Sequence, residues 1–135
     1  MRIFLDANVL FSAAKSEGAV RQLLALLTKA GHECCADGFV VEEARRNLAA
    51  KAPDGVAVLE AMLLRMRVAA AQAVDPGLEG RLPLPEKDRP VMSAAIRQGC
   101  AALVTGDRTH FGPLYGKTVE GVRIYPPRMI AEELL

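Results

Sequence analysis

The 135-residue sequence contains no tryptophan, and aromatic side chains make up only 4% of it. A surface that stacks single-stranded bases on aromatic rings is therefore poorly supported. The three cysteines are odd in number and form no C-x-x-C pair. This pattern excludes a disulfide framework and the usual structural zinc spacing, so we expect buried, reduced thiols.

The sequence also lacks an excess of charge of either sign and long apolar runs. The formal net charge of +1 gives no basic signature, so a nucleic-acid partner would require locally clustered positive charge or a metal ion. No apolar run approaches the length of a membrane span. The N-terminus carries an early acid in place of the charged and apolar segments of a signal peptide. We therefore expect a soluble, cytoplasmic protein with no membrane partner.

The overall amino-acid composition is that of a globular protein. Hydrophobic residues make up 51% and charged residues 24%, which excludes a disordered chain. A length of 135 residues allows one well-formed core but is too short for two ordinary domains. We expect a single domain over residues 1–135.

Apolar patterns along the chain predict strands that alternate with helices. The predicted strands span residues 3–5, 33–36, 68–74, 101–105 and 118–125. The predicted helices begin at residue 8, span residues 18–30, 39–50 and 88–98, and follow Asp54, a candidate N-cap, and Pro127. Residues 76–85, with three prolines, are predicted to form a loop. This alternation predicts an α/β fold, with a parallel sheet covered by helices on both faces.

Four acidic residues occupy comparable places in this pattern. Asp6 and Asp107 each follow a predicted strand. Glu43 lies in the first turns of a predicted helix, and Asp88 stands at the start of another. Right-handed crossovers place the carboxyl ends of strands and the following helix starts at one edge of the sheet. We therefore expect the four acids to lie together.

Each acid also has a local explanation. Asp6 and Asp88 suit the N-caps of helices, and Asp107 suits a turn. Glu43 suits a solvated surface position beside Glu42. Each explanation is ordinary for one residue alone, but chance convergence of all four is less expected than a shared site.

Four neighbouring carboxylates require a cation, because like charges raise each other's pKa and destabilise the fold. One or two Mg²⁺ or Mn²⁺ ions suit such oxygen ligands, and no His/Cys cluster favours zinc. These ions lower the pKa of a bound water and stabilise the charge on a phosphodiester under attack. Asn8 and Thr105 are candidates to orient a carboxylate or a metal-bound water, although both residue types are also common caps.

Four blocks of sequence resemble a known family. LDANVL, EEARRNL, DRPVMSAAI and LVTGDRTHF, in this order, are similar to the signature blocks of PIN domains, and the resemblance runs from Met1 to the Pro126-Pro127 tail. It implies a three-layer α/β/α fold with a central parallel sheet and a Mg²⁺- or Mn²⁺-dependent ribonuclease activity. Many small bacterial relatives are VapC-type toxins, which a cognate antitoxin inhibits and which commonly form homodimers.

The resemblance also assigns residues. Carried over by position, the four family acids, which are catalytic and bind the metal, are Asp6, Glu43, Asp88 and Asp107. Glu42 is a less suitable match than Glu43. Many relatives carry a further Asp one turn after the fourth acid, where this chain has His110. That difference weakens the expectation of a second metal ion, but a histidine there can still contact phosphate or a metal.

Basic residues near the acids are candidates for binding RNA. They are Arg45, Arg46, Arg89 and Arg108. Together with His110 they would form the local phosphate-binding rim that the net charge hides. The alternative is a set of solvated arginines on helix faces.

The favoured hypothesis is a metal-dependent endoribonuclease that acts as the toxin of a toxin–antitoxin pair. A PIN-like module that binds RNA or protein without cutting remains open, and the departure at His110 is its support. A phospho-acceptor receiver or a haloacid-dehalogenase-like phosphatase is the third hypothesis. It would require paired acids or a D-x-D motif after the first strand, whereas this chain has Asp6-Ala7-Asn8.

Overall fold

The computed structural model describes residues 1–135, which form one six-stranded sheet with helices on both faces. The strands are β1 (Arg2–Leu5), β2 (Glu33–Asp37), β3 (Arg67–Ala69), β4 (Ala102–Val104), β5 (Thr118–Val119) and β6 (Val122–Tyr125). The α-helices are α1 (Ala7–Lys15), α2 (Ala19–Lys29), α3 (Gly38–Lys51), α4 (Gly55–Leu63), α5 (Pro76–Glu79), α6 (Arg89–Arg97) and α7 (Pro127–Leu134). Two 3₁₀ turns complete the structure, η1 (Glu86–Asp88) and η2 (Gly112–Leu114). None of the helices combines the length and the apolar character that a membrane crossing requires.

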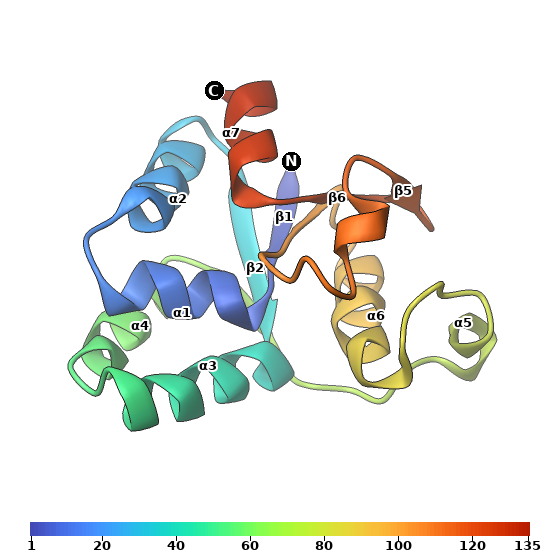
Figure 1. The fold of residues 1–135 in the computed structure, drawn as a ribbon, viewed down its shortest axis with the longest axis horizontal. Helices are drawn as coiled ribbons and strands as arrows, with labels where there is room; N and C mark the ends of the chain where they lie inside the picture. The colour runs from blue at the N-terminus through green and yellow to red at the C-terminus, as the bar shows by residue number, and fades with distance from the viewer.

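The strands lie in the order β3-β2-β1-β4-β6-β5. All neighbours are parallel except β5 and β6, which form an antiparallel pair. The chain runs outward from β1 to β3 and then crosses back to β4 on the other side of β1. Crossovers in opposite directions place their helices on opposite faces of the sheet, and Figure 1 shows α1 to α4 on one side of β1 and β2, with α6 on the other. The predicted three-layer α/β/α fold is therefore confirmed.

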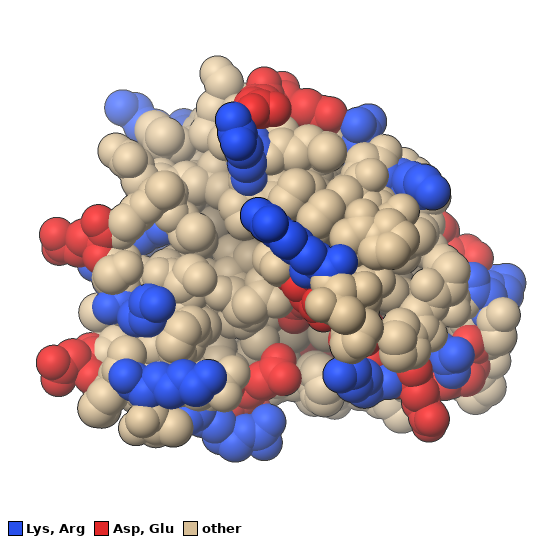
Figure 2. All heavy atoms as spheres, viewed as in Figure 1, with Lys and Arg blue, Asp and Glu red and all other residues tan.

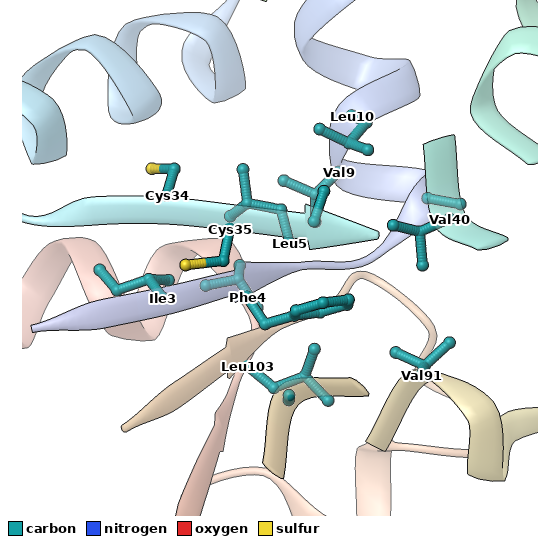
Figure 3. Packing of buried hydrophobic residues seen from close by; sticks show 14 of the residues in the cluster. Ile3, Phe4, Leu5, Val9, Leu10, Cys34, Cys35, Val40, Val91 and Leu103 are labelled. Atoms are coloured by element: carbon teal, nitrogen blue, oxygen red, sulfur yellow. The ribbon is translucent and has the colours of Figure 1, made fainter. Parts of the chain in front are cut away.

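The core is centred on β1, whose apolar side chains are covered from both sides. Phe4 lies on the α6 side with Leu103 of β4 and Val91 of α6, whereas Leu5 lies on the α1 side with Val9 (Figure 3). Phe4, Leu5 and Leu103 have no exposed surface. A run that is apolar on both faces suits a central parallel strand, since helices cover both of its sides. The carboxyl end of this strand is thereby held in a fixed position.

The predicted strand over residues 118–125 is wrong as a single element. The structure divides it into the hairpin of β5 and β6, with Glu120 and Gly121 between the two strands. Both residues have positive φ angles, 49° and 83°. Two successive residues in the left-handed region form the tight turn whose twist matches an antiparallel pair. The β-branched pattern identified the strands but not the turn.

Two other predictions near the edge of the sheet required correction. The strand predicted over residues 68–74 is the short β3, which pairs with β2 alone and ends at Ala69. The loop predicted over residues 76–85 contains one helical turn, α5. Its cap is Asp75, whose carboxylate accepts the backbone N–H of Gly77 at 2.8 Å.

Two predicted helix caps do not form. Asp54 precedes α4 and Asp88 precedes α6, but neither side chain accepts a hydrogen bond from its helix. Both residues have helical backbone angles, whereas a capping residue normally has an extended backbone that turns its side chain toward the helix. The carboxylate of Asp88 is therefore free to take part in a site elsewhere.

Candidate functional site

A cleft of about 500 Å³ opens at the carboxyl ends of β1 and β4. The chain leaves β1 toward β2 and leaves β4 toward β6, so the direction of winding changes between these two strands. Such a switch point leaves a crevice at the strand ends. The four predicted acids all line the cleft, and they are Asp6, Glu43, Asp88 and Asp107. Figure 2 shows acidic atoms in a hollow near the middle of this face, with Lys and Arg side chains around it.

Asp6 is the most deeply buried of the four acids, with 6% of its surface exposed. One carboxylate oxygen accepts the N–H of Ala7 at 2.7 Å and the other accepts the hydroxyl of Thr105 at 2.8 Å. The predicted N-cap is thus confirmed, and α1 begins at Ala7, one residue earlier than expected. Burial raises the pKa of Asp6 to about 6, with smaller upward contributions from Glu43 and Asp107, although the hydrogen bond from Thr105 opposes this rise.

Thr105 and Asn8 fix the loop after β4 against the start of α1. The Thr105 hydroxyl accepts hydrogen bonds from the backbone N–H of Asp107 at 3.1 Å and from the Asn8 side chain at 3.3 Å. The side-chain oxygen of Asn8 accepts the N–H of Gly106 at 2.7 Å. Because the same hydroxyl donates to Asp6, one buried group links the acids that follow β1 and β4.

Asp107, Asp88 and His110 form a compact cluster of side chains in the cleft. One oxygen of Asp107 accepts the N–H groups of Thr109 and His110 at 3.0 and 3.1 Å, which confirms the predicted turn. The ligand atoms of Asp88, Asp107 and His110 all lie within 4.8 Å of one another. Burial raises the pKa of Asp88, and Asp107 adds to this rise, whereas His110 opposes it.

Glu43 lines the cleft from α3, and its neighbour Glu42 does not. Glu42 is exposed and forms an ion pair with Arg45 at 3.1 Å, and Arg45 also pairs with Glu60 at 2.7 Å. Arg45 is therefore held on the outer surface of α3. The structure distinguishes two adjacent glutamates that the sequence alone left as alternatives.

The basic residues that line the cleft are lysines, which sequence reasoning missed. Lys51 lies on α3 and Lys87 precedes Asp88. Asn47 also lines the cleft, and its spacing of four residues from both Glu43 and Lys51 places all three on one helix face. That spacing was a signal available in the sequence.

None of the predicted arginines lines the cleft. Arg46 and Arg108 are exposed. Arg89 instead donates to the carbonyl of Leu84 at 3.0 Å and to the carboxylate of Glu79 at 2.8 Å. Arg89 therefore holds the loop after α5 against the start of α6, and its cation is already neutralised there.

The donor set of the cleft fits a divalent cation. Oδ2 of Asp88 and Nδ1 of His110 are buried atoms without a hydrogen-bond partner. Carboxylates supply the remaining donors, and no cysteine lines the cleft. Such a donor set suits hard or borderline divalent ions. Structural zinc sites, in contrast, commonly use thiolate ligands, which this cleft lacks.

Comparison with known structures shows the same fold in other proteins. VapBC2 from Rickettsia felis, bound to a DNA fragment from its promoter, has 18% identity, covering 93% of this chain and 98% of that chain, with a TM-score of 0.68. DNA-bound VapBC from Salmonella typhimurium has 18% identity, with 94% and 98% covered and a TM-score of 0.67. Mycobacterium tuberculosis VapC20, a Sarcin-Ricin loop cleaving toxin, has 14% identity, with 79% and 91% covered and a TM-score of 0.57.

Comparison with sequences gives a family match alone. No curated protein matches the chain. The family model for the PIN domain matches residues 2–109, a range that begins with β1 and ends within the loop that carries Asp107. Since this match covers most of the sequence and includes all four acids of the cleft, the chain belongs to the PIN domain family.

Proposed function

We propose that the protein is a metal-dependent endoribonuclease that hydrolyses RNA phosphodiester bonds and acts as the toxin of a toxin–antitoxin pair. The observation that carries this proposal is the convergence of four acids, from four separate parts of the chain, on one cleft at the switch point of the sheet. Membership of the PIN domain family and the likeness to a Sarcin-Ricin loop cleaving toxin support it.

In this proposal the four acids bind the metal and form the catalytic site. They are Asp6, Glu43, Asp88 and Asp107. A bound Mg²⁺ or Mn²⁺ ion supplies an activated water and stabilises charge on the phosphodiester. Thr105 and Asn8 hold Asp6 in place, and the ammonium groups of Lys51 and Lys87 favour the approach of a phosphate. The exposed Arg46 and Arg108 are proposed to contact the RNA outside the cleft.

The proposed partner is a cognate antitoxin. Two of the similar structures are VapBC assemblies bound to DNA, which supports a protein partner for this chain as well. The homodimer and the cytoplasmic location stay predictions.

Cleavage of structured and unstructured RNAs tests the proposal, and the adjacent glutamates provide a matched pair of variants. With Mg²⁺ or Mn²⁺ we expect cutting by the wild type and no cutting with EDTA. Glu43→Gln removes a cleft carboxylate and is expected to lower the cleavage rate by roughly 100-fold. Glu42→Gln, which changes only an outer ion pair, is expected to retain wild-type activity.

Two outcomes would contradict the proposal. Cutting that persists in EDTA, or that is equal in the two variants, would show that the activity does not come from this cleft. RNA binding without cutting under any metal condition would instead favour the binding module.

Thr105→Val tests the role of the hydroxyl that joins Asp6 to Asp107. Valine has a similar shape but can neither donate to Asp6 nor accept from the backbone of Asp107. Loss of such a supporting contact is expected to weaken Mn²⁺ binding by about 10- to 100-fold. Isothermal titration with Mn²⁺ measures this, and Thr118→Val, at an exposed position of β5, is the control. Equal Mn²⁺ affinity in both variants would remove Thr105 from the metal site.

A further inference from the structure

His110 lies in the cleft with the Nδ1 atom of its ring between two carboxylates. Nδ1 is 2.9 Å from Oδ2 of Asp88 and 3.3 Å from Oδ2 of Asp107. Neither Nδ1 nor Oδ2 of Asp88 has a hydrogen-bond partner, although both atoms are buried. The two atoms therefore face each other at ion-pair distance, and no hydrogen bond satisfies either of them. Buried polar atoms without partners are rare in folded proteins and require an explanation.

The position of His110 is fixed by its own backbone. Its N–H donates to Oδ1 of Asp107 at 3.1 Å, which leaves Oδ2 of the same carboxylate to face the imidazole ring. The next residue, Phe111, is fully buried, and its N–H donates to the carbonyl of Asp107 at 3.2 Å. Because a hydrogen bond fixes the backbone of His110 and the next residue is buried in the core, the imidazole ring is held in the cleft.

The separations of these atoms suit ligands of one ion. Two ligands bound side by side at about 2.1 Å in an octahedral shell lie about 3 Å apart. The observed distances from Nδ1 of His110 to the carboxylates of Asp88 and Asp107, 2.9 and 3.3 Å, agree with that spacing. The three atoms come from the start of α6 and from the loop after β4, so the cation would join two separate parts of the chain.

We propose that His110 is a metal ligand and that, together with Asp88 and Asp107, it makes the cleft bind Mn²⁺ in preference to Mg²⁺. This inference rests on the proposed metal-dependent function and specifies which ion the site selects. Mg²⁺ binds oxygen ligands and retains several waters, whereas an imidazole nitrogen binds first-row transition metals more strongly. An acidic residue at position 110 would give an all-oxygen site with a smaller preference for Mn²⁺.

Electron paramagnetic resonance with Mn²⁺ tests the proposal on the intact, tag-free protein. Electron spin-echo modulation detects a ¹⁴N nucleus bound to Mn²⁺, and competition with Mg²⁺ gives the ratio of the two affinities. We expect a ¹⁴N coupling in the wild type. In His110→Asp we expect the coupling to disappear while Mn²⁺ still binds, and the preference for Mn²⁺ over Mg²⁺ to fall by roughly tenfold.

The chain has only two histidines, so the assignment of a ¹⁴N signal is direct. His32 lies beside the N-terminal amine, 3.1 Å from its nitrogen, and just before β2, at the opposite edge of the sheet from the cleft. His32→Ala is therefore the control and should keep both the coupling and the metal preference.

Wild-type protein that binds Mn²⁺ without a ¹⁴N coupling would overturn the proposal, and this measurement requires no variant. An unchanged metal preference in a folded His110→Asp protein would also overturn it. The RNA assay tests the other proposal separately. A ¹⁴N coupling in a protein that cuts no RNA would contradict the ribonuclease and retain the metal ligand.

Discussion

Asp6→Asn is expected to abolish RNA cleavage and at the same time to raise the melting temperature of the metal-free protein. The loss of activity, at least about 1000-fold, follows from removing a carboxylate that binds the metal in the proposed site. The gain in stability follows from burial. The carboxylate of Asp6 is almost fully enclosed, and without a cation its negative charge is costly there.

The direction of the pH dependence follows from the pKa of Asp6, which burial raises from 3.8 to about 6 in the folded protein. Between these values the folded state binds more protons than the unfolded state, so the free energy of unfolding decreases as the pH rises from about 4 to about 6. Each pKa unit corresponds to about 1.4 kcal/mol, so the ionised carboxylate costs roughly 3 kcal/mol above pH 6. An asparagine avoids this cost.

Thermal unfolding in EDTA at pH 4 and pH 7.5 measures the effect. The two proteins should melt at similar temperatures at pH 4, and Asp6→Asn should melt about 10 °C higher at pH 7.5. Asp54→Asn, at an exposed position without a side-chain hydrogen bond to its helix, should match the wild type at both pH values. An Asp6→Asn protein that is less stable at pH 7.5, or that still cuts RNA, would contradict the described role of this residue.

Phe4→Ala is expected to have the largest effect on stability. Phe4 has no exposed surface and packs on the α6 side of the sheet with Leu103 and Val91 (Figure 3). Truncation of a buried phenylalanine to alanine leaves a cavity and typically costs about 3–5 kcal/mol. The free energy of unfolding of single domains is about 5–15 kcal/mol, so this variant is expected to be only marginally stable.

Urea unfolding of Phe4→Ala and of a second phenylalanine variant provides the comparison. Phe39, at the start of α3, is 40% exposed, and Phe39→Ala is expected to cost less than about 1.5 kcal/mol. Similar losses in the two variants would mean that the core is not centred on β1 as described.

The sequence was sufficient to place the four acids at one edge because of where they stand in the chain. Asp6 and Asp107 come directly after the buried strands β1 and β4, and in a parallel sheet such positions lead to the same edge. Glu43 and Asp88 belong to helix starts that share this edge. Apolar periodicity and strand composition predict where strands end and helices begin. The placement of the four acids at one edge follows from those positions alone.

Features that depend on the direction of a side chain could not be predicted from the sequence in this way. Asp88 has the sequence context of a helix cap, yet its helical backbone turns the carboxylate into the cleft. Arg89 follows Asp88 directly, but its guanidinium is held by Glu79 and the carbonyl of Leu84. A similar limit applies to Tyr115, whose hydroxyl donates to the carbonyl of Thr105 at 2.9 Å. This bond depends on the fold of the loop after β4 and has no local pattern.

The position of β1 between β2 and β4 has a consequence for the order of folding. The central strand β1 is synthesised before both of its neighbours, and one of them, β4, follows only after β2, β3 and the helices between them. The hydrogen bond between Asp6 and Thr105 joins residues 99 positions apart. Contacts this distant in sequence form late, because a long chain segment must be ordered first. A nascent chain therefore carries Asp6 without its cleft until β4 and the loop after it have been synthesised, and the site is assembled late in folding.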